Sequence, residues 1–299
     1  MKNFIIELVV YCGLQIPSLK GKHVYMKNKD AVLKTIDKIR EGGASKLQVV
    51  TDFDLTLTKQ HVDGKHCLSS FGMFTKSKQL PQNYKEASVR LYKKYRPIEI
   101  DPNLSIEKKI EAMEEWMSAT HDILRDFEFD PKELDDIVKI HGTSLRDGTK
   151  SLIERLSRAD VPILVFSAGL GDVVEAVLRH HDVLFDNVKI ISNFLKYEGN
   201  KVLGFKGTRL IHVFNKNEHS IDHDYFKLLE GRRNIILMGD MTGDANMADG
   251  VKDVDSILKI GFLYEHIEEN LPLYLEAFDI VLVDDQTMNV TTEILERIV

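Results

Sequence analysis

The chain has 299 residues, of which 43% are hydrophobic and 29% are charged, and its formal net charge is −7. This balance is typical of a folded globular protein and excludes fibrous and intrinsically disordered classes. Because an acidic chain has no general attraction for phosphate polymers, we expect no nucleic-acid polymer among its partners. Cys12 and Cys67 are too few for a disulfide framework or a cysteine zinc site, which favours a cytoplasmic location.

Residues 4–14 form a mostly apolar run that Glu7 interrupts. A run of this length is too short to span a bilayer, and it lacks the basic start and cleavage site of a secretion signal. We therefore expect an N-terminal helix that lies on the domain, without stable membrane association. A weak membrane anchor is the alternative interpretation.

The chain then alternates between helical patterns and short apolar runs. Residues 30–40, 147–157 and 172–180 have the periodicity of amphipathic helices. Continuous apolar runs, typical of strands covered on both faces, occupy residues 47–51, 162–166, 188–191, 235–238 and 280–283. This alternation predicts an α/β fold with a doubly wound parallel sheet, that is, a Rossmann-like core.

The stretch between the first two predicted strands, residues 59–143, is mainly helical and too long for a single crossover. Ser105 is positioned to cap one helix, while Asp130 marks the start of another, which Gly142 ends. We predict an inserted helical cap domain over residues 59–143 and a Rossmann-like core made of residues 1–58 and 144–299. The cap would cover the carboxyl edge of the sheet, where open α/β sheets bind ligands.

Two pairs of acidic residues directly follow predicted strands. Asp52 and Asp54 follow the first strand, and Asp240 and Asp244 follow the run 235–238. In the first pair one carboxylate can bind a metal and attack phosphorus, while the other handles the leaving-group proton; the second pair adds carboxylates to the same edge of the sheet. The alternative for each pair is a polar turn at the end of a strand. On the first pair alone, the two interpretations are equally favoured.

Two weaker motifs fall at comparable positions. Ser167, Ala168 and Gly169 lie between a strand and a helix, where a hydroxyl and backbone N–H groups can bind phosphate, although a plain turn is favoured for this motif alone. Lys216 alone reads as a solvated surface charge. Together with the acids, all these residues fall at carboxyl ends of predicted strands, in chain order. Clustered carboxylates repel one another, and a hard divalent cation such as Mg²⁺ removes that penalty.

The order Asp-x-Asp-x-Thr, Ser, Lys and Gly-Asp-x-x-x-Asp resembles that of the haloacid-dehalogenase-like superfamily. More narrowly, residues 30–299 resemble the cytosolic 5′-nucleotidase III family, which includes pyrimidine and 7-methylguanosine phosphate-specific nucleotidases. Each matching motif is modest alone, but the set is highly specific. The matching segments are TDFDLTLT, RPIEIDP, FSAGLGD, SNF, GFKG, LIHVFNK, GDMTGDANMADGV, ILKIGFL and DIVLVDDQTM.

The resemblance implies roles for the residues of these motifs. Asp52 would be the nucleophile, and Asp54 the general acid that later serves as base for water. Mg²⁺ would bind Asp52, the backbone carbonyl of Asp54, and Asp240. Asp244 would contact these ligands without binding the metal itself. The transferring phosphoryl group would be bound by the segment Ser167, Ala168 and Gly169 together with Lys216.

The resemblance also implies that the cap selects the base. Glu99 would recognise the base edge, since a carboxylate accepts from the exocyclic amine of cytosine or from the N–H edge of 7-methylguanine; a solvated acid is the alternative. Candidates for stacking on the base are Phe71, Phe74 and Trp116, for which packing within the cap is the alternative and is favoured for Trp116. Related cap-nucleotide enzymes often have an aromatic residue at the position of Met117, and Thr120 replaces a Ser or Ala among the substrate-binding residues. These departures argue against strict 7-methylguanosine specificity.

The function implied is that of a magnesium-dependent 5′-nucleotidase that hydrolyses CMP, UMP or 7-methyl-GMP through an aspartyl-phosphate. The small-molecule partner would be a nucleoside monophosphate, and we expect a monomer. Transfer of the phosphoryl group to a nucleoside is allowed by the same resemblance. Two alternatives stay open: a phosphatase of the same superfamily that acts on a non-nucleotide metabolite such as phosphoserine, and a non-catalytic binder of cap nucleotides.

Overall fold

The computed structural model describes residues 15–142, 144–207, 209–217, 229 and 231–299. Within these residues the main sheet has seven strands in the order β1-β12-β11-β10-β2-β6-β7, and only β1 runs antiparallel to its neighbour. The strands are β1 (Val24–Tyr25), β2 (Leu47–Thr51), β6 (Ile163–Leu170), β7 (Val188–Asn193), β10 (Asn234–Gly239), β11 (Ser256–Leu263) and β12 (Ile280–Val283). The α/β class and the parallel sheet expected from the sequence are confirmed, whereas the N-terminal run 4–14 lies outside the described residues.

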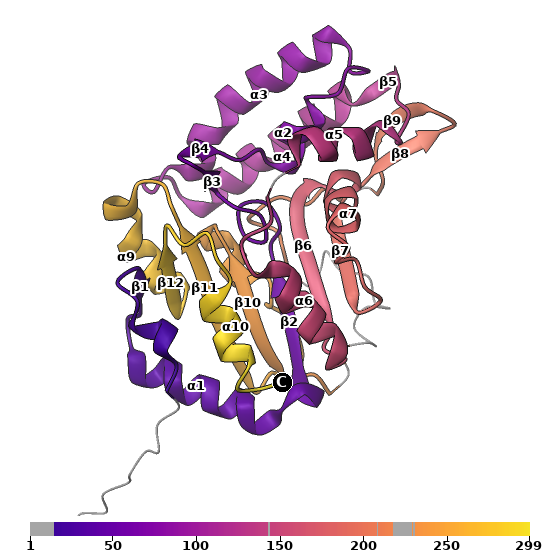
Figure 1. Ribbon diagram of the computed structural model, residues 1–299. Helices are drawn as coiled ribbons and strands as arrows, with labels where there is room; N and C mark the ends of the chain where they lie inside the picture. The colour runs from indigo at the N-terminus through magenta and orange to yellow at the C-terminus, as the bar shows by residue number, and fades with distance from the viewer. Residues whose placement is uncertain (1–14, 143, 208, 218–228, 230) are drawn as a thin grey trace, which may run out of the picture.

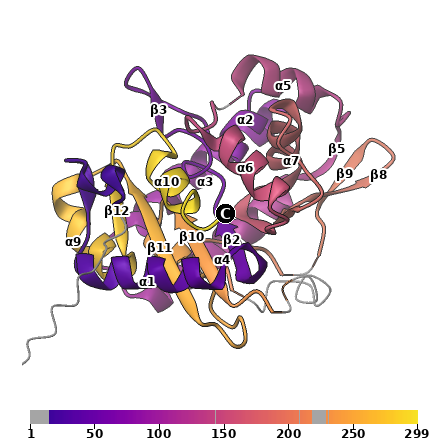
Figure 2. The ribbon, with the colours of Figure 1, turned by 60° about the horizontal axis from the view of Figure 1, so that its bottom comes forward.

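Both faces of this sheet are covered by apolar side chains, because the central strands consist almost entirely of apolar residues. Val49 of β2 belongs to one core cluster and its neighbour Val50 to the other. The first cluster contains residues from α1 (Lys29–Gly42), α6 (Thr149–Arg158), α7 (Gly171–His180) and α10 (Asn289–Leu295), and the second contains Tyr274 of α9 (Ile267–Ala277). Figures 1 and 2 show α6 and α10 on the same face of the sheet.

A group of helices lies above the carboxyl ends of the strands (Figure 1). It consists of α2 (Ser70–Phe74), α3 (Gln82–Ile100), α4 (Ile106–Ile123) and α5 (Glu133–His141). The short hairpin of β3 (His61–Val62) and β4 (Lys65–His66) precedes these helices in the chain. A three-stranded antiparallel sheet borders it, in the order β5-β9-β8. Its strands are β5 (Arg125–Glu128), β8 (Leu195–Glu198) and β9 (Lys201–Phe205). Thus β9, from outside the range 59–143, pairs with β5 inside it, and β8 pairs with β9.

Several boundaries differ from the sequence prediction for local reasons. Strand β6 continues to Leu170 instead of ending at residue 166, because side chains of β7 bond to its irregular end. Helix α5 begins at Glu133, since the Asp130 carboxylate accepts from the Lys132 N–H in a turn that precedes the helix. Ser105 occupies the position before α4, but its hydroxyl makes no capping bond to the backbone.

Among the described residues, no helix has the length and apolar character that crossing a membrane requires.

Candidate active site

Three acids meet at the carboxyl edge of the sheet. Asp52 follows β2 and Asp240 follows β10, and these strands are neighbours in which Thr51 pairs with Met238. The Asp52 N–H donates to the Met238 carbonyl at 2.9 Å, which continues the pairing by one residue. Asp244 lies in the short 3₁₀ helix η4 (Thr242–Asn246). One carboxylate oxygen from each of the three acids lies within 4.8 Å of the others.

A single lysine bridges two of these acids. Lys216 is only 4% exposed, and its ammonium donates to Oδ1 of Asp52 and, at 2.8 Å, to Oδ1 of Asp244. Burial lowers the Lys216 pKa, but the charges of Asp244 and Asp52 outweigh burial and the net pKa is raised. From the sequence, Lys216 could be predicted as a site residue only in combination with the acids.

The excess of negative charge appears in the pKa values of the acids. Burial is the main cause that raises the pKa of Asp52 to about 7, against the opposing charge of Lys216 and with a further increase from Asp244. Burial, followed by the charges of Asp52 and Asp244, also raises the pKa of Asp240 well above its ordinary value. Among the described residues, Lys216 thus bonds two of three clustered carboxylates, of which Asp240 is partly exposed, and a further cation would relieve their repulsion.

The donor atoms of this cluster fit a metal ion. Oδ2 of Asp52 is buried and has no hydrogen-bond partner among the described residues. Asp244, by contrast, has both oxygens engaged, since Oδ2 accepts from the Met241 N–H at 2.9 Å. A site built from carboxylate oxygens suits a hard divalent cation, so Asp52 and Asp240 could bind it directly while Asp244 orients Lys216.

Asp54 lies apart from the three clustered acids and contacts the inserted segment instead. Its Oδ1 accepts from the Ser70 N–H at 2.7 Å, and its Oδ2 accepts from the Ser70 hydroxyl at 2.6 Å. Burial raises the pKa of Asp54, and the two hydrogen bonds from Ser70 partly offset that increase. Ser70 was not among the residues predicted from the sequence.

The segment 167–169 lies at the irregular end of β6, beside β2. Ser167 is buried, and its hydroxyl accepts from the Gly169 N–H at 3.0 Å. Asn193 of β7 donates to the Ala168 carbonyl at 2.9 Å, which fixes the bend from the side. A side chain at position 169 would be excluded, because its Cβ would lie 2.1 Å from the Ser70 hydroxyl. Asn193 lies in the SNF motif, but no role was predicted for it from the sequence.

Another functional residue that was not predicted from the sequence is Arg146, which is 1% exposed. Its guanidinium donates to the carbonyls of Leu55 at 2.6 Å and Thr56 at 2.8 Å, and also to that of Asp285. It lies 3.9 Å above the ring of Phe262. The loop that follows Asp54 is therefore held through its main chain.

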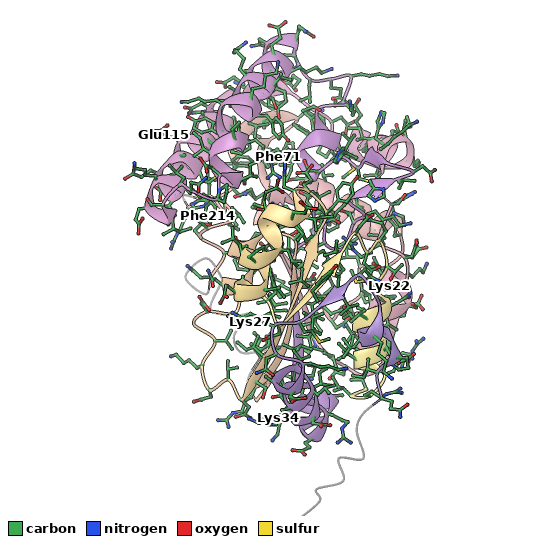
Figure 3. All side chains as sticks on the ribbon, turned by 90° about the vertical axis from the view of Figure 1, so that its left-hand side faces the viewer. Lys22, Lys27, Lys34, Phe71, Glu115 and Phe214 are labelled. Carbon is green, nitrogen blue, oxygen red and sulfur yellow. The ribbon has the colours of Figure 1, made fainter. Side chains whose placement is uncertain are left out.

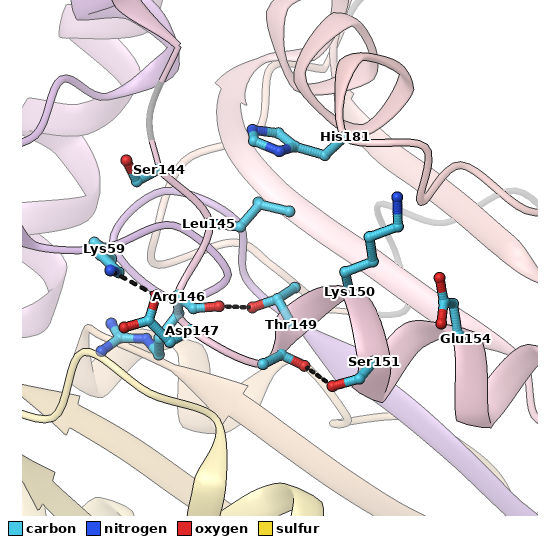
Figure 4. A pocket seen from close by; sticks show the side chains of 11 residues that line it. Lys59, Ser144, Leu145, Arg146, Asp147, Thr149, Lys150, Ser151, Glu154 and His181 are labelled. Carbon is cyan, nitrogen blue, oxygen red and sulfur yellow. Dashed lines mark hydrogen bonds and ion pairs between the residues drawn. The ribbon is translucent and has the colours of Figure 1, made fainter.

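Arg146 also borders a cavity of about 590 Å³, in which Figure 4 shows the ion pair of Lys59 and Asp147.

A cavity of about 440 Å³ connects the acid cluster with the end of α3, since both Asp240 and Glu99 line it. Glu99 forms a 2.5 Å ion pair with Arg96, one turn earlier in α3. Phe214, near the boundary between the inserted helices and the sheet, also lines this cavity (Figure 3). The Lys109 ammonium of α4 lies 5.7 Å from the centre of its ring.

The residues proposed to stack on a base lie elsewhere. Phe74 is fully buried against Phe129, and Phe71 packs edge-on against Phe205. Trp116 stacks on Tyr95 within the helix pair α3 and α4, at 5.8 Å between ring centres. Met117 and Thr120 are buried on α4, and the Thr120 hydroxyl donates to the Trp116 carbonyl. None of the candidates lines the 440 Å³ cavity, and their roles stay predictions.

Comparisons with known proteins bear on this arrangement. A family model described as pyrimidine 5′-nucleotidase (UMPH-1) matches residues 55–299. A 7-methylguanosine phosphate-specific 5′-nucleotidase of Drosophila melanogaster is 44% identical over 286 residues, which cover 95% of this chain and 89% of that protein. A crystal structure of cytosolic 5′-nucleotidase IIIB bound to cytidine superposes with a TM-score of 0.90 at 44% identity, covering 95% of this chain and 96% of that one.

More distant structures share the fold alone. A HAD-family hydrolase from Salmonella enterica matches with a TM-score of 0.53 at 11% identity, over 86% of this chain and 73% of that one. The predicted resemblance to the nucleotidase family is confirmed, and so is the predicted haloacid-dehalogenase-like fold. With acids and a lysine gathered at the carboxyl edge of a haloacid-dehalogenase-like sheet, the chain belongs to the pyrimidine 5′-nucleotidase (UMPH-1) family of phosphoric monoester hydrolases.

Proposed function

We propose that this 5′-nucleotidase is magnesium-dependent and that it hydrolyses nucleoside 5′-monophosphates through a phosphoryl group held covalently on Asp52. The observation that carries the proposal is the state of the Asp52 carboxylate. Its Oδ1 is held by Lys216, whereas its Oδ2 is buried without a hydrogen-bond partner among the described residues. An oriented oxygen without a partner, next to a cation, is suited to attack phosphorus.

The first half-reaction would use two acids in different roles. Oδ2 of Asp52 forms a bond to phosphorus as the bond between phosphorus and O5′ breaks, and O5′ keeps the electron pair. Asp54 supplies the proton that O5′ takes up, which releases the nucleoside. Lys216 would bind a phosphoryl oxygen, and so would Ser167 together with backbone N–H groups of its segment.

The second half-reaction returns the enzyme to its starting state. Asp54, now ionised, takes a proton from water while the water oxygen bonds to phosphorus and the Asp52 ester bond breaks. A nucleoside hydroxyl that replaces water would give the phosphotransferase reaction by the same steps. Mg²⁺ held by Asp240, the carbonyl of Asp54 and the Asp52 oxygen that does not attack phosphorus would supply positive charge against the phosphoryl oxygens.

We propose that Glu99 reads the base from the far end of the 440 Å³ cavity. The relatives are named for 7-methylguanosine phosphate, and the related structure contains cytidine. Both bases present N–H groups from which a carboxylate can accept hydrogen bonds.

We also propose a cytosolic location, which the name of cytosolic 5′-nucleotidase IIIB supports, and a monomeric state.

The deciding experiment measures phosphate release from CMP, UMP, AMP, GMP, 7-methyl-GMP and phosphoserine, with Mg²⁺ and with EDTA. We expect turnover of CMP, UMP or 7-methyl-GMP that requires Mg²⁺, and loss of at least about 1,000-fold in Asp52→Asn, because the nucleophile is removed. Full activity of that variant would reject covalent catalysis by Asp52. Fast phosphoserine turnover with poor nucleotides would reject the role of Glu99, and tight nucleotide binding without turnover would indicate a binder.

A further inference from the structure

Ser70 is a buried serine that makes every hydrogen bond of the Asp54 carboxylate that the structure records. Its N–H donates to Oδ1 at 2.7 Å, and its hydroxyl donates to Oδ2 at 2.6 Å. A carboxylate bound at both oxygens by one residue has a fixed plane, because rotation about its side chain would break both bonds. Each carboxylate oxygen retains a second acceptor position, which leaves room for the proton that Asp54 handles.

The hydroxyl of Ser70 is itself oriented by a third segment. The Leu170 N–H, at the end of β6, donates to the Ser70 Oγ at 3.0 Å. Since that oxygen accepts from an N–H, its single proton is directed to Asp54. One hydroxyl therefore connects the loop after β2, the segment beside Ser167 and the start of α2.

The main chain at Gly169 packs closely against this hydroxyl. A Cβ placed at Gly169 would lie 2.1 Å from the Ser70 Oγ and 2.7 Å from Oδ2 of Asp54. Ser70 is 0% exposed and belongs to α2, which lies in the segment inserted between β2 and β6. The orientation of Asp54 therefore depends on the inserted segment as well as on its own strand.

We propose that Ser70 is a positioning residue of the reaction: it holds the Asp54 carboxyl in the orientation that protonates the leaving oxygen. This inference rests on the proposed acid–base role of Asp54. The step it assists moves a proton from Asp54 to O5′ as the phosphorus–O5′ bond breaks and O5′ keeps the electron pair. For a substrate whose leaving group departs without a proton, this first half-reaction should depend far less on Ser70.

The test compares two substrates in the full-length enzyme with Mg²⁺. One is the best nucleoside monophosphate of the panel, whose alkoxide leaving group needs a proton, and the other is p-nitrophenyl phosphate, whose phenolate does not. We expect Ser70→Ala to lower the ratio of kcat/KM for the nucleotide over kcat/KM for the aryl phosphate by roughly 10- to 100-fold, because kcat/KM reports transfer of the phosphoryl group to Asp52 and excludes the later hydrolysis, in which Asp54 acts on both substrates. Ser69→Ala is the matched control, because Ser69 caps the same helix through the Gly72 N–H and makes no recorded bond to Asp54.

A mutant cycle keeps the proposal testable whatever the aryl phosphate rate is. If Ser70 acts through Asp54, Ser70→Ala should reduce nucleotide turnover little further in an Asp54→Asn background. The proposal would be overturned if Ser70→Ala left the ratio of the two substrates unchanged. It would also be overturned if Ser70→Ala lowered nucleotide turnover as much in the Asp54→Asn background as in the wild type. If Asp54→Asn itself left nucleotide turnover unchanged, the proposed role of Asp54 would fail; a loss there with an unchanged Ser70→Ala ratio rejects only the role of Ser70.

Discussion

Asp52 is an acid whose surroundings oppose its charge. Burial raises its pKa most, Lys216 lowers it, Asp244 raises it again, and the result is about 7 compared with an ordinary value of 3.8. At a pH between these two pKa values, Asp52 of the metal-free folded protein retains a proton that Asp52 of the unfolded chain has released. The folded state is therefore favoured at the acidic end of this window and loses that advantage as the pH rises.

We expect the metal-free protein to lose stability between about pH 4 and pH 7, and Asp52→Asn to flatten this dependence because asparagine does not titrate. The difference between the two profiles should be on the order of 1–4 kcal/mol across the window. Urea unfolding in EDTA at several pH values measures it. Asp160→Asn serves as control, since the Asp160 side chain is 98% exposed. Parallel profiles for wild type and Asp52→Asn would contradict the prediction.

At the scale of single residues, the sequence pointed to those that follow apolar strands. Asp52 and Asp240 could be predicted because each directly follows such a run, and parallel strands end at one edge. Ser70 and Arg146 could not, because their partners are main-chain groups and a carboxylate that lie between 16 and 139 residues away in the chain. A serine or an arginine with such distant partners leaves no local pattern.

At the scale of elements, the N-terminal strand β1 covers one edge of the main sheet. Val24 pairs with Leu282 and Tyr25 with Val281, in an antiparallel arrangement. The short helix η1 (Pro17–Lys20) precedes β1, and it buries Leu19, while Ile16 just before it is buried as well. This segment thus contributes both strand pairing and apolar packing to the core.

We expect a chain that begins at residue 27 to be less stable than one that begins at residue 15. Burial of Ile16 and Leu19 contributes roughly 1.5–3 kcal/mol each, so the loss should be about 3 kcal/mol or more. Thermal and urea unfolding of the two truncated chains, measured side by side, give the difference. Matching midpoints for the two chains would show that β1 and η1 contribute no stability.

The prediction of elements was wrong where the apolar pattern was interrupted. Strand β11 was not predicted as a strand, although it lies between β10 and β12, because Lys259 and Gly261 break its apolar run. Gly261 is required by packing, since a Cβ there would lie 2.5 Å from the Phe278 ring. Strands β8 and β9 are short and pair with each other, and β9 also pairs with β5, which is distant in the sequence, so their existence depends on tertiary structure.

At the scale of the whole molecule, strand order decides where the chemistry lies. The central order β10-β2-β6 places the three strands that lead to Asp240, Asp52 and Ser167 side by side. The sequence predicted a shared edge, but it did not predict this order, because pairing between distant strands leaves no local trace. A cation bound at this edge would connect neighbouring strands and offset the repulsion of three acids.

We therefore expect Mg²⁺ to stabilise the folded protein against heat. At a cation concentration near 100 times Kd, binding contributes about 2.7 kcal/mol, which corresponds to a rise in Tm of roughly 5 °C or more. Asp240→Asn should remove most of this gain, whereas Asp249→Asn, at an exposed acid of the same region, should retain it. Differential scanning fluorimetry with Mg²⁺ and with EDTA tests this. An equal gain in wild type and Asp240→Asn would place the cation elsewhere.

The hold of Arg146 on the main chain of the loop after Asp54 has a consequence for protein engineering. The Leu55 carbonyl is fixed by the guanidinium, while the Leu55 side chain lines the 440 Å³ cavity. The φ of Leu55 is +63°, in the left-handed region, so asparagine or glycine can occupy this position without strain. Position 55 is thus a place where the cavity wall can be redesigned while the nucleophile and its acid keep their backbone.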